Sequence, residues 1–242
     1  MHIPDGFLSP PVWLSLDAIS LPAVAWLARR TRTKPAPLLG VMGAFILAAQ
    51  MVNIPIGLGS SGHLMGASLL AVTLGPTSAM LVMTAVLILQ ALLFQDGGVL
   101  ALGANIFNMA LAGVALGYLP VRLWGRSAIP VFLGGALSVL TTATLALFQL
   151  NLSGLAITGR PLWISTAAFA LTAALEGTIT VAALRAIERL SPHTLHAEPR
   201  GASFPLRALA CATLLLLCGI WLSSSSPDGL QSLTESIGLQ GR

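Results

Sequence analysis

The chain has 242 residues, of which 55% are hydrophobic and only 8% are charged. Soluble globular domains carry about 25% charged residues, so this composition excludes a soluble enzyme and a disordered chain. Its 12 Lys and Arg residues, set against 8 Asp and Glu residues, are too few for a surface that tracks phosphates, and we expect no nucleic-acid partner. The composition predicts an all-α, polytopic helix bundle embedded in membrane lipid.

The first apolar run, over about residues 11–28, is predicted to be a retained transmembrane helix and not a cleaved signal peptide. A signal peptide carries its positive charge before the apolar core. Here residues 1–28 contain Asp5 and Asp17 but no Lys or Arg, and a basic cluster follows at 29–34. This order predicts an N-terminus outside the cytoplasm.

Eight apolar runs are predicted to cross the membrane, because a bilayer core requires about 20 apolar residues per helix. The third run is short and Gly75-Pro76 separates it from the fourth, so we expect a half-span or a tilted helix inside the bundle there. With the N-terminus outside, ten Lys and Arg fall in inner loops and two in outer segments, as the positive-inside rule requires. The runs cover roughly residues 11–28, 38–57, 63–75, 77–94, 99–119, 128–149, 162–184 and 206–223.

The first two residues form a candidate metal chelate. A free amine at Met1, the backbone nitrogen of His2 and its imidazole can close adjacent chelate rings on one ion, and we expect Met1 to be retained because a bulky residue follows. The backbone nitrogen must lose its proton, which favours Ni(II) or Cu(II) in square-planar geometry. His63, expected on the same outer face, can supply a fourth nitrogen. The residues leave a second interpretation open, in which both histidines are ordinary residues of interfacial loops.

The glycine-rich loop over 57–63 and the fifth predicted helix supply further candidates. Gly59-Ser60-Ser61-Gly62 fits a short serine-hydrolase pattern, but no histidine other than His63 lies within a predicted helix to act as a general base. Asn105 and Asn108 lie three apart on one helix face and either bond the loops of the site or join helices. Residues that could surround the metal are Asn53, Ser60, Ser61, Gln95 and Asn105.

Two carboxylates, Asp17 and Glu176, fall within predicted spans, where ionisable side chains are functional candidates. A proton relay requires several carboxylates in file, so these two favour structural hydrogen bonding, although Glu176 could also line a pathway or contact a partner. The sequence lacks the G-x-x-x-x-G-K-[ST] phosphate-binding loop, so we expect no ATP bound by this chain and no enzymatic activity.

The opening sequence Met1-His2-Ile3-Pro4-Asp5-Gly6-Phe7-Leu8 resembles the CbiM/NikM family. These proteins are the substrate-capturing S components of energy-coupling-factor transporters for cobalt and nickel. Gly62-His63-Leu64, Gln95-Asp96-Gly97-Gly98 and Gly103-Ala104-Asn105 resemble the family in order and spacing, so the similarity covers about residues 1–190. The resemblance implies that Met1, His2 and His63 hold Ni(II) or Co(II) as the transported ion. It also implies that a transmembrane T component and two cytoplasmic ATPase subunits drive release into the cell.

The C-terminal segment resembles a second kind of subunit. Pro227-Asp228-Gly229-Leu230 follows a single apolar helix, like the PDGLE-type segment of the small N-type accessory subunits, with Gln231 where the usual motif has Glu. We therefore expect a metal-capturing bundle over 1–190, a basic cytoplasmic linker over 191–205, and an accessory helix with an extracytoplasmic tail over 206–242, all in the cell (inner) membrane.

Nickel is favoured slightly over cobalt, because four nitrogens in a plane suit low-spin Ni(II). The alternative from another functional class is a stand-alone secondary transporter of an uncharged small solute. Such a transporter would work without ATPase partners and would be indifferent to replacement of His2.

Overall fold

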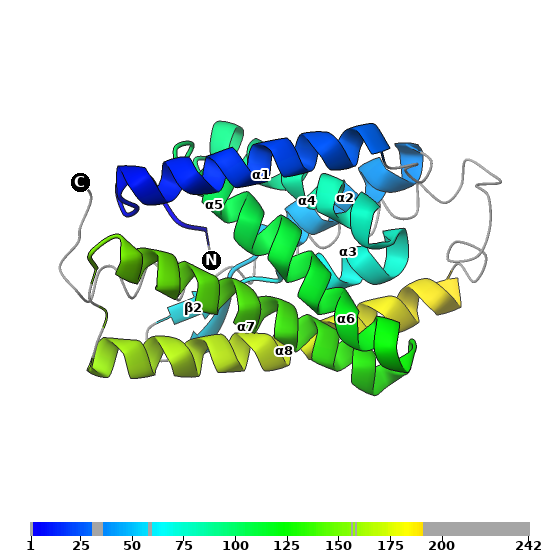
Figure 1. Cartoon of the computed structure of the whole chain (residues 1–242). Coiled ribbons are helices and arrows are strands. Elements are labelled where there is room, and N and C mark those ends of the chain that lie inside the picture. The colour runs from blue at the N-terminus through cyan, green and yellow to red at the C-terminus, as the bar shows by residue number, and fades with distance from the viewer. Residues whose placement is uncertain (1, 31–35, 58–59, 156, 158, 191–242) are drawn as a thin grey trace.

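The computed structural model describes residues 2–30, 36–57, 60–155, 157 and 159–190, which form a helix bundle with one short β-hairpin (Figure 1). Within this part, five helical stretches are long and apolar enough to cross a membrane, and the apolar helix α2 is shorter. The predicted polytopic helical bundle is confirmed. In chain order the elements are α1 (Pro10–Arg30), α2 (Ala36–Gln50), β1 (Ile54–Gly57), β2 (Ser60–Gly62), α3 (Ala67–Leu74), α4 (Pro76–Leu89), the π-helical segment η1 (Gln90–Phe94), α5 (Leu102–Asn105), the π-helical segment η2 (Ile106–Gly113), α6 (Val114–Trp124), α7 (Ala128–Leu152) and α8 (Arg160–Leu190).

The third apolar run forms a half-length helix. All eight residues of α3 are buried, and at 1.5 Å per residue the helix is about 12 Å long, less than half of the hydrocarbon core. Gly75, with a φ of 86°, separates α3 from α4, and Pro76 occupies the first position of α4, where a missing N–H costs nothing. The structure therefore has a short, fully buried helix at this run, as both expected alternatives require. The eighth predicted run, over 206–223, lies outside the described residues.

The second run is shorter than predicted, because the helix ends at Gln50 and does not continue to residue 57. The following residues form β1, which pairs antiparallel with β2, and Ile54 faces Gly62 in the register. This hairpin was not predicted. It ends directly before His63, so it brings that residue to the start of the segment that leads into α3.

The N-terminal segment turns back into the bundle instead of extending away from it (Figure 1). Ile3 and Leu8 are buried in a cluster with Ala101, Ala104 and Leu150, so the segment packs against residues of α5 and α7. The Asp5 carboxylate fixes it further, because its oxygens accept the N–H groups of residues 99–101 at 2.8 to 3.1 Å. Apolar packing and the hydrogen bonds of Asp5 therefore fix the N-terminal segment and, with it, the position of His2.

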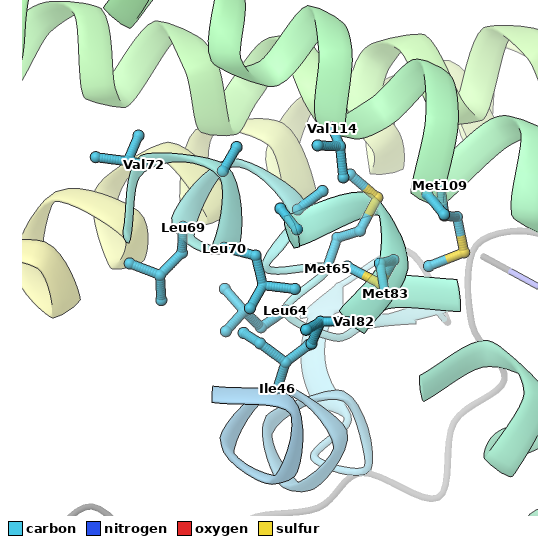
Figure 2. Close-up of a cluster of buried hydrophobic side chains, with 14 of the residues drawn as sticks. Ile46, Leu64, Met65, Leu69, Leu70, Val72, Val82, Met83, Met109 and Val114 are labelled. Atoms are coloured by element: carbon cyan, nitrogen blue, oxygen red, sulfur yellow. The ribbon is translucent and has the colours of Figure 1, made fainter. Parts of the chain in front are cut away.

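The main core surrounds α3 and the residues that precede it (Figure 2). Met65, Leu69 and Leu70 are fully buried and pack with Ile46 of α2 and Met83 of α4. Close-packed protein interiors leave side chains little freedom. Contacts with several helices therefore fix the segment between His63 and α3.

Candidate metal-binding site

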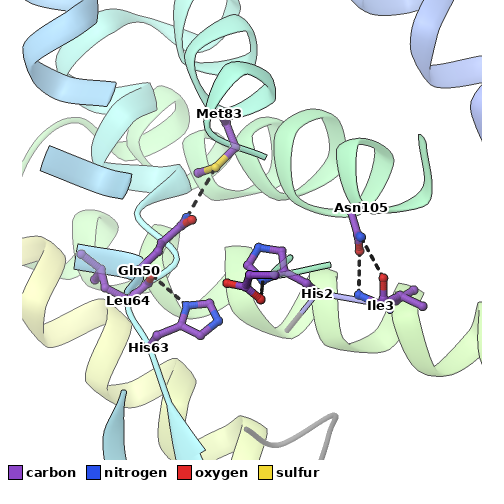
Figure 3. A network of polar contacts seen from close by, with 8 residues as sticks. His2, Ile3, Gln50, His63, Leu64, Met83 and Asn105 are labelled. Carbon is purple, nitrogen blue, oxygen red and sulfur yellow. Dashed lines mark hydrogen bonds and ion pairs between the residues drawn. The ribbon is translucent and has the colours of Figure 1, made fainter. Parts of the chain in front are cut away.

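The two predicted histidines lie together inside the bundle (Figure 3). The ring centroids of His2 and His63 are 5.5 Å apart and the ring planes are inclined by 5°, which is a stacked arrangement. His2 is 5% exposed and His63 is 7% exposed. The structure therefore brings together two imidazoles that are far apart in sequence, as expected for the N-terminal segment and the loop before α3.

The hydrogen bonds of the two rings assign their protons. His2 Nδ1 is 3.0 Å from Asp96 Oδ1, and His63 Nδ1 is 3.1 Å from the carbonyl oxygen of Leu64. Both partners accept, so each Nδ1 donates, and when a ring is neutral its lone pair lies on Nε2. The Nε2 atom of His2 is buried without a hydrogen-bond partner. The site therefore combines two imidazoles with a carboxylate, a set of groups that suits a cation.

Asp96 is ionised beside His2. Burial alone would raise the pKa of the carboxyl, but the hydrogen bond and positive charge of His2, with a smaller effect of His63, hold that pKa well below its usual range. Asp96 belongs to the predicted Gln95-Asp96-Gly97-Gly98 turn, but the sequence analysis assigned it no chemistry. Asp96 could have been recognised as a site residue from the two glycines that follow it in a turn predicted on the same face as the histidines.

Asn105 holds the main chain next to His2. Its Oδ1 accepts the N–H of Ile3 at 2.8 Å and its Nδ2 donates to the carbonyl of Ile3 at 3.0 Å, while the N–H of Gly98 reaches that carbonyl at 2.9 Å. A Cβ atom on Gly97, which has a φ of +93°, would lie 3.1 Å from Cβ of His2. Glycine therefore lets the turn approach the N-terminal segment, and Asn105 fastens it.

Both π-helical segments border these residues. η1 ends directly before Gln95 and Asp96, and η2 begins directly after Asn105. Short π-helical stretches inside α-helices are frequently found at functional sites. Their positions are consistent with a site formed by the N-terminal segment, the turn at 95–98 and the start of α5.

The main chain after His63 is held by two polar side chains. The Nε2 atom of Gln50 donates to the carbonyl of Met65 at 2.7 Å. Glu176 accepts the N–H groups of Met65 and Gly66 at 2.7 and 2.8 Å. The sequence predicts neither the contact of Gln50 nor a specific role for Glu176.

The remaining predicted residues lie around the site in different ways. Asn53 is half-buried between α2 and β1, and Gln95 is exposed with a left-handed φ of 54°. Ser60 and Ser61 belong to β2, and Met1 lies outside the described residues. Within the described part of the chain, no group of three or more His, Cys, Asp or Glu side chains is arranged to hold a metal ion.

Two other polar residues of the predicted spans serve helix packing. Asn108 and Gln149 exchange two amide hydrogen bonds at 2.8 and 2.6 Å and so join η2 to α7. Asp17 accepts the N–H of Gly103 at 2.8 Å and so joins α1 to α5. Of the two amides three residues apart, Asn105 therefore contacts a loop of the site and Asn108 joins helices.

Comparisons with known proteins match most of the chain. Residues 2–194 match the model of the CbiM family, described as the cobalt uptake substrate-specific transmembrane region. The chain is 33% identical over 222 residues to the "Probable fused nickel transport protein LarMN" of Lactiplantibacillus plantarum, covering 82% of this chain and 68% of that protein. It is 34% identical over 214 residues to the "Cobalt transport protein CbiM" of Kyrpidia tusciae, covering 81% and 86% of the two chains. A crystal structure described as a transition metal transporter has a TM-score of 0.67 and 31% identity, and the match covers 78% of this chain and 93% of that one.

Proposed function

This chain belongs to the CbiM family, and we propose that it is the membrane subunit that captures Ni(II) or Co(II) for an ATP-driven importer. Family membership and five apolar helices make it a multi-pass membrane protein of the cobalt and nickel uptake type. Its relatives are named as transport proteins, not enzymes, so the serine-hydrolase interpretation of residues 57–63 is set aside. The observation that carries the proposal is the stacking of buried His2 on buried His63.

The proposed ligands are the amine of Met1, the backbone nitrogen and Nδ1 of His2, and Nε2 of His63. Nδ1 of His2 can close a six-membered ring with its own backbone nitrogen, whereas Nε2 lies on the far side of the imidazole. A metal ion at Nδ1 therefore replaces the proton that this atom donates to Asp96. The bond from Nδ1 of His63 to the carbonyl of Leu64 supports Nε2 as the ligating atom, because an acceptor bonded to one ring nitrogen fixes the tautomer of the ring.

The charges at the site favour a divalent ion over an uncharged solute. A metal ion bound to a deprotonated backbone nitrogen keeps a net positive charge, which the ionised and half-buried carboxylate of Asp96 can balance. Nothing comparable is required by a neutral substrate. Nickel is favoured over cobalt, because four nitrogen ligands in a plane suit low-spin Ni(II).

The same proposal assigns the energy source and the topology. A transmembrane T component and two cytoplasmic ATPase subunits would reorient this subunit and release the ion inward. The N-terminus and the tail are proposed to be extracytoplasmic, with the inner loops carrying ten of the 12 Lys and Arg residues. Residues 191–205 are the proposed linker and 206–242 the proposed accessory segment, which the word "fused" in the name of the Lactiplantibacillus plantarum relative supports.

Adding residues before Met1 tests the chelate directly. The protein with its native N-terminus is compared with one that carries Gly-Ser before Met1, and nickel binding is measured by equilibrium dialysis. The same dipeptide inserted after Gly125, in the exposed loop between α6 and α7, is the matched control. We expect tight binding to be lost only with the N-terminal addition, and equal affinity of all three proteins would contradict the proposal.

A further inference from the structure

The carboxylate of Glu176 is the most deeply placed acidic group of the described chain that the proposed ligand set does not use. Glu176 is 1% exposed and lies in the middle of α8. Its Oε2 atom accepts the N–H of Met65 at 2.7 Å and its Oε1 atom accepts the N–H of Gly66 at 2.8 Å. An acidic side chain is costly inside a membrane protein and is a functional candidate by default.

Glu176 is the acceptor for both of these main-chain N–H groups. The first N–H groups of a helix lack partners from the preceding turn, and Gly66, the N-cap residue of α3, has no side-chain hydrogen bond that caps the helix. Gly66 also has a left-handed φ of +73°, and a Cβ atom there would overlap Ile46. Glu176 therefore supplies, from across the bundle, the acceptors that this buried turn requires.

Close packing of α7 on α8 fixes where Glu176 lies along the bundle relative to α7. A Cβ atom on Gly177 would lie 2.6 Å from the carbonyl oxygen of Phe132, and one on Gly135 would lie 2.8 Å from Cα of Gly177. The two helix backbones are therefore in contact at this level, as small residues allow in membrane bundles. The carboxylate next to Gly177 has a fixed position from which to hold the turn before α3.

The turn that Glu176 holds carries His63. Met65 is two residues after His63, and Nδ1 of His63 donates to the carbonyl of Leu64 between them. Glu176 also lines a small cavity together with His63 and Leu64. A shift of the main chain at Met65 therefore changes the direction in which the imidazole of His63 points.

We infer that Glu176 is a positioning residue that fixes His63 for metal capture by bonding the main chain of Met65 and Gly66. The inference rests on the proposed function, since it requires His63 to be a ligand. Glu176 acts through the main chain and touches no metal ion itself. Its role is distinct from that of Gln50, which bonds the opposite side of the same peptide segment through the carbonyl of Met65.

The test uses a double-mutant cycle on the full-length chain with its native N-terminus. Glu176→Gln keeps the shape of the side chain, but its NH₂ group faces one of the two N–H donors and cannot accept from it. Loss of a partner that orients a metal ligand costs about 10- to 100-fold in affinity, so we expect Glu176→Gln to weaken Ni(II) binding by about that factor. In a His63→Ala background, the same change should produce no further loss.

The absorption spectrum of bound Ni(II) provides a readout that a general loss of stability does not move. With nickel at saturation, the ligand-field bands of Glu176→Gln should shift toward those of His63→Ala. Thr180→Val is the matched control, because Thr180 lies one turn after Glu176 on α8, is 0% exposed and does not line the cavity that Glu176 shares with His63. Its spectrum and affinity should equal those of the unchanged protein.

The outcomes separate the inference from the proposed function. If the unchanged protein binds no nickel, or if His63→Ala binds as well as it does, the proposed function fails and the inference with it. If His63→Ala binds nickel much more weakly than the unchanged protein, but Glu176→Gln binds like the unchanged protein, the inference alone is overturned. An equal loss from Glu176→Gln in both backgrounds also overturns it, because the effect then does not pass through His63. If Glu176→Gln does not fold, Glu176→Asp replaces it in the same cycle, with a smaller loss expected only when His63 is present.

Discussion

Replacing Asn105 by alanine tests whether the N-terminal segment must be held inside the bundle for metal to bind. The amide makes two hydrogen bonds to the main chain of Ile3, at 2.8 and 3.0 Å, and Ile3 is 0% exposed. The carbonyl of Ile3 keeps its bond from Gly98, so the variant leaves only the Ile3 N–H buried without a partner. An orphaned buried donor costs about 1–3 kcal/mol and a lost hydrogen bond about 0.5–1.5 kcal/mol, so docking should weaken by about 2–4 kcal/mol.

This loss sets an upper limit on the change in metal affinity. A factor of ten in affinity corresponds to about 1.4 kcal/mol. If the N-terminal segment is only marginally docked in the unchanged protein, nickel affinity should therefore fall by about 30- to 1,000-fold. If the segment is more stably docked, the loss of nickel affinity is smaller, because the apparent affinity scales with the fraction of molecules in which the segment is docked. The assay is a competition titration of Ni(II) against a coloured chelator, with a thermal unfolding curve measured on each sample.

Asn108→Ala is the matched control for this experiment. It also removes two buried amide hydrogen bonds, those with Gln149 at 2.8 and 2.6 Å, but these bonds join η2 to α7 and do not involve the main chain of the N-terminal segment. We expect Asn108→Ala to lower the unfolding temperature and to leave nickel affinity close to that of the unchanged protein. Unchanged nickel affinity in Asn105→Ala, or an equal loss in both variants, would refute the reasoning.

Gly97→Ala should weaken nickel binding, because its Cβ atom would press on His2. Gly154→Ala is the control, with a similar φ of +90° but open space around it, and it should lower stability without changing nickel affinity. Equal nickel affinities of the two variants would count against this reasoning. Nickel affinity should fall from about pH 8 to about pH 5, because protons compete for the ligand nitrogens. The pKa of Asp96 is held well below its usual range, so the stabilisation from its contact with His2 is present above about pH 4 and is lost only in stronger acid. Asp96→Asn should therefore weaken binding throughout the window from about pH 5 to 8, and unchanged nickel affinity in this variant would contradict this assignment.

The sequence predicts the bundle and the pairing of the histidines because both depend on local patterns. Apolar runs of bilayer length mark the helices, and Gly75-Pro76 marks the end of the half-length helix α3. The chelate chemistry of a second-position histidine depends on its distance from the terminal amine, so His2 could be proposed as a ligand without a structure. His63 follows a glycine-rich loop, and the order of apolar runs places that loop at the same end of the bundle as the N-terminal segment.

The residues that hold these histidines could not be predicted in the same way. The partners of Glu176 are main-chain N–H groups at 65 and 66, which carry no side-chain signature, and the contact depends on the relative height of α3 and α8. Gln50 likewise bonds a carbonyl. The β-hairpin was missed because its first strand, Ile54–Gly57, continues an apolar run, and a run of this length fits either a helix or a buried strand.

Metal content and affinity of the purified protein with its native N-terminus test the central claim most directly, measured beside His2→Ala and His63→Ala. The account predicts one tightly bound nickel or cobalt ion per chain, lost in both variants. No metal above background in the unchanged protein, or unchanged binding in the two variants, would contradict it; the former would favour a transporter of an uncharged solute.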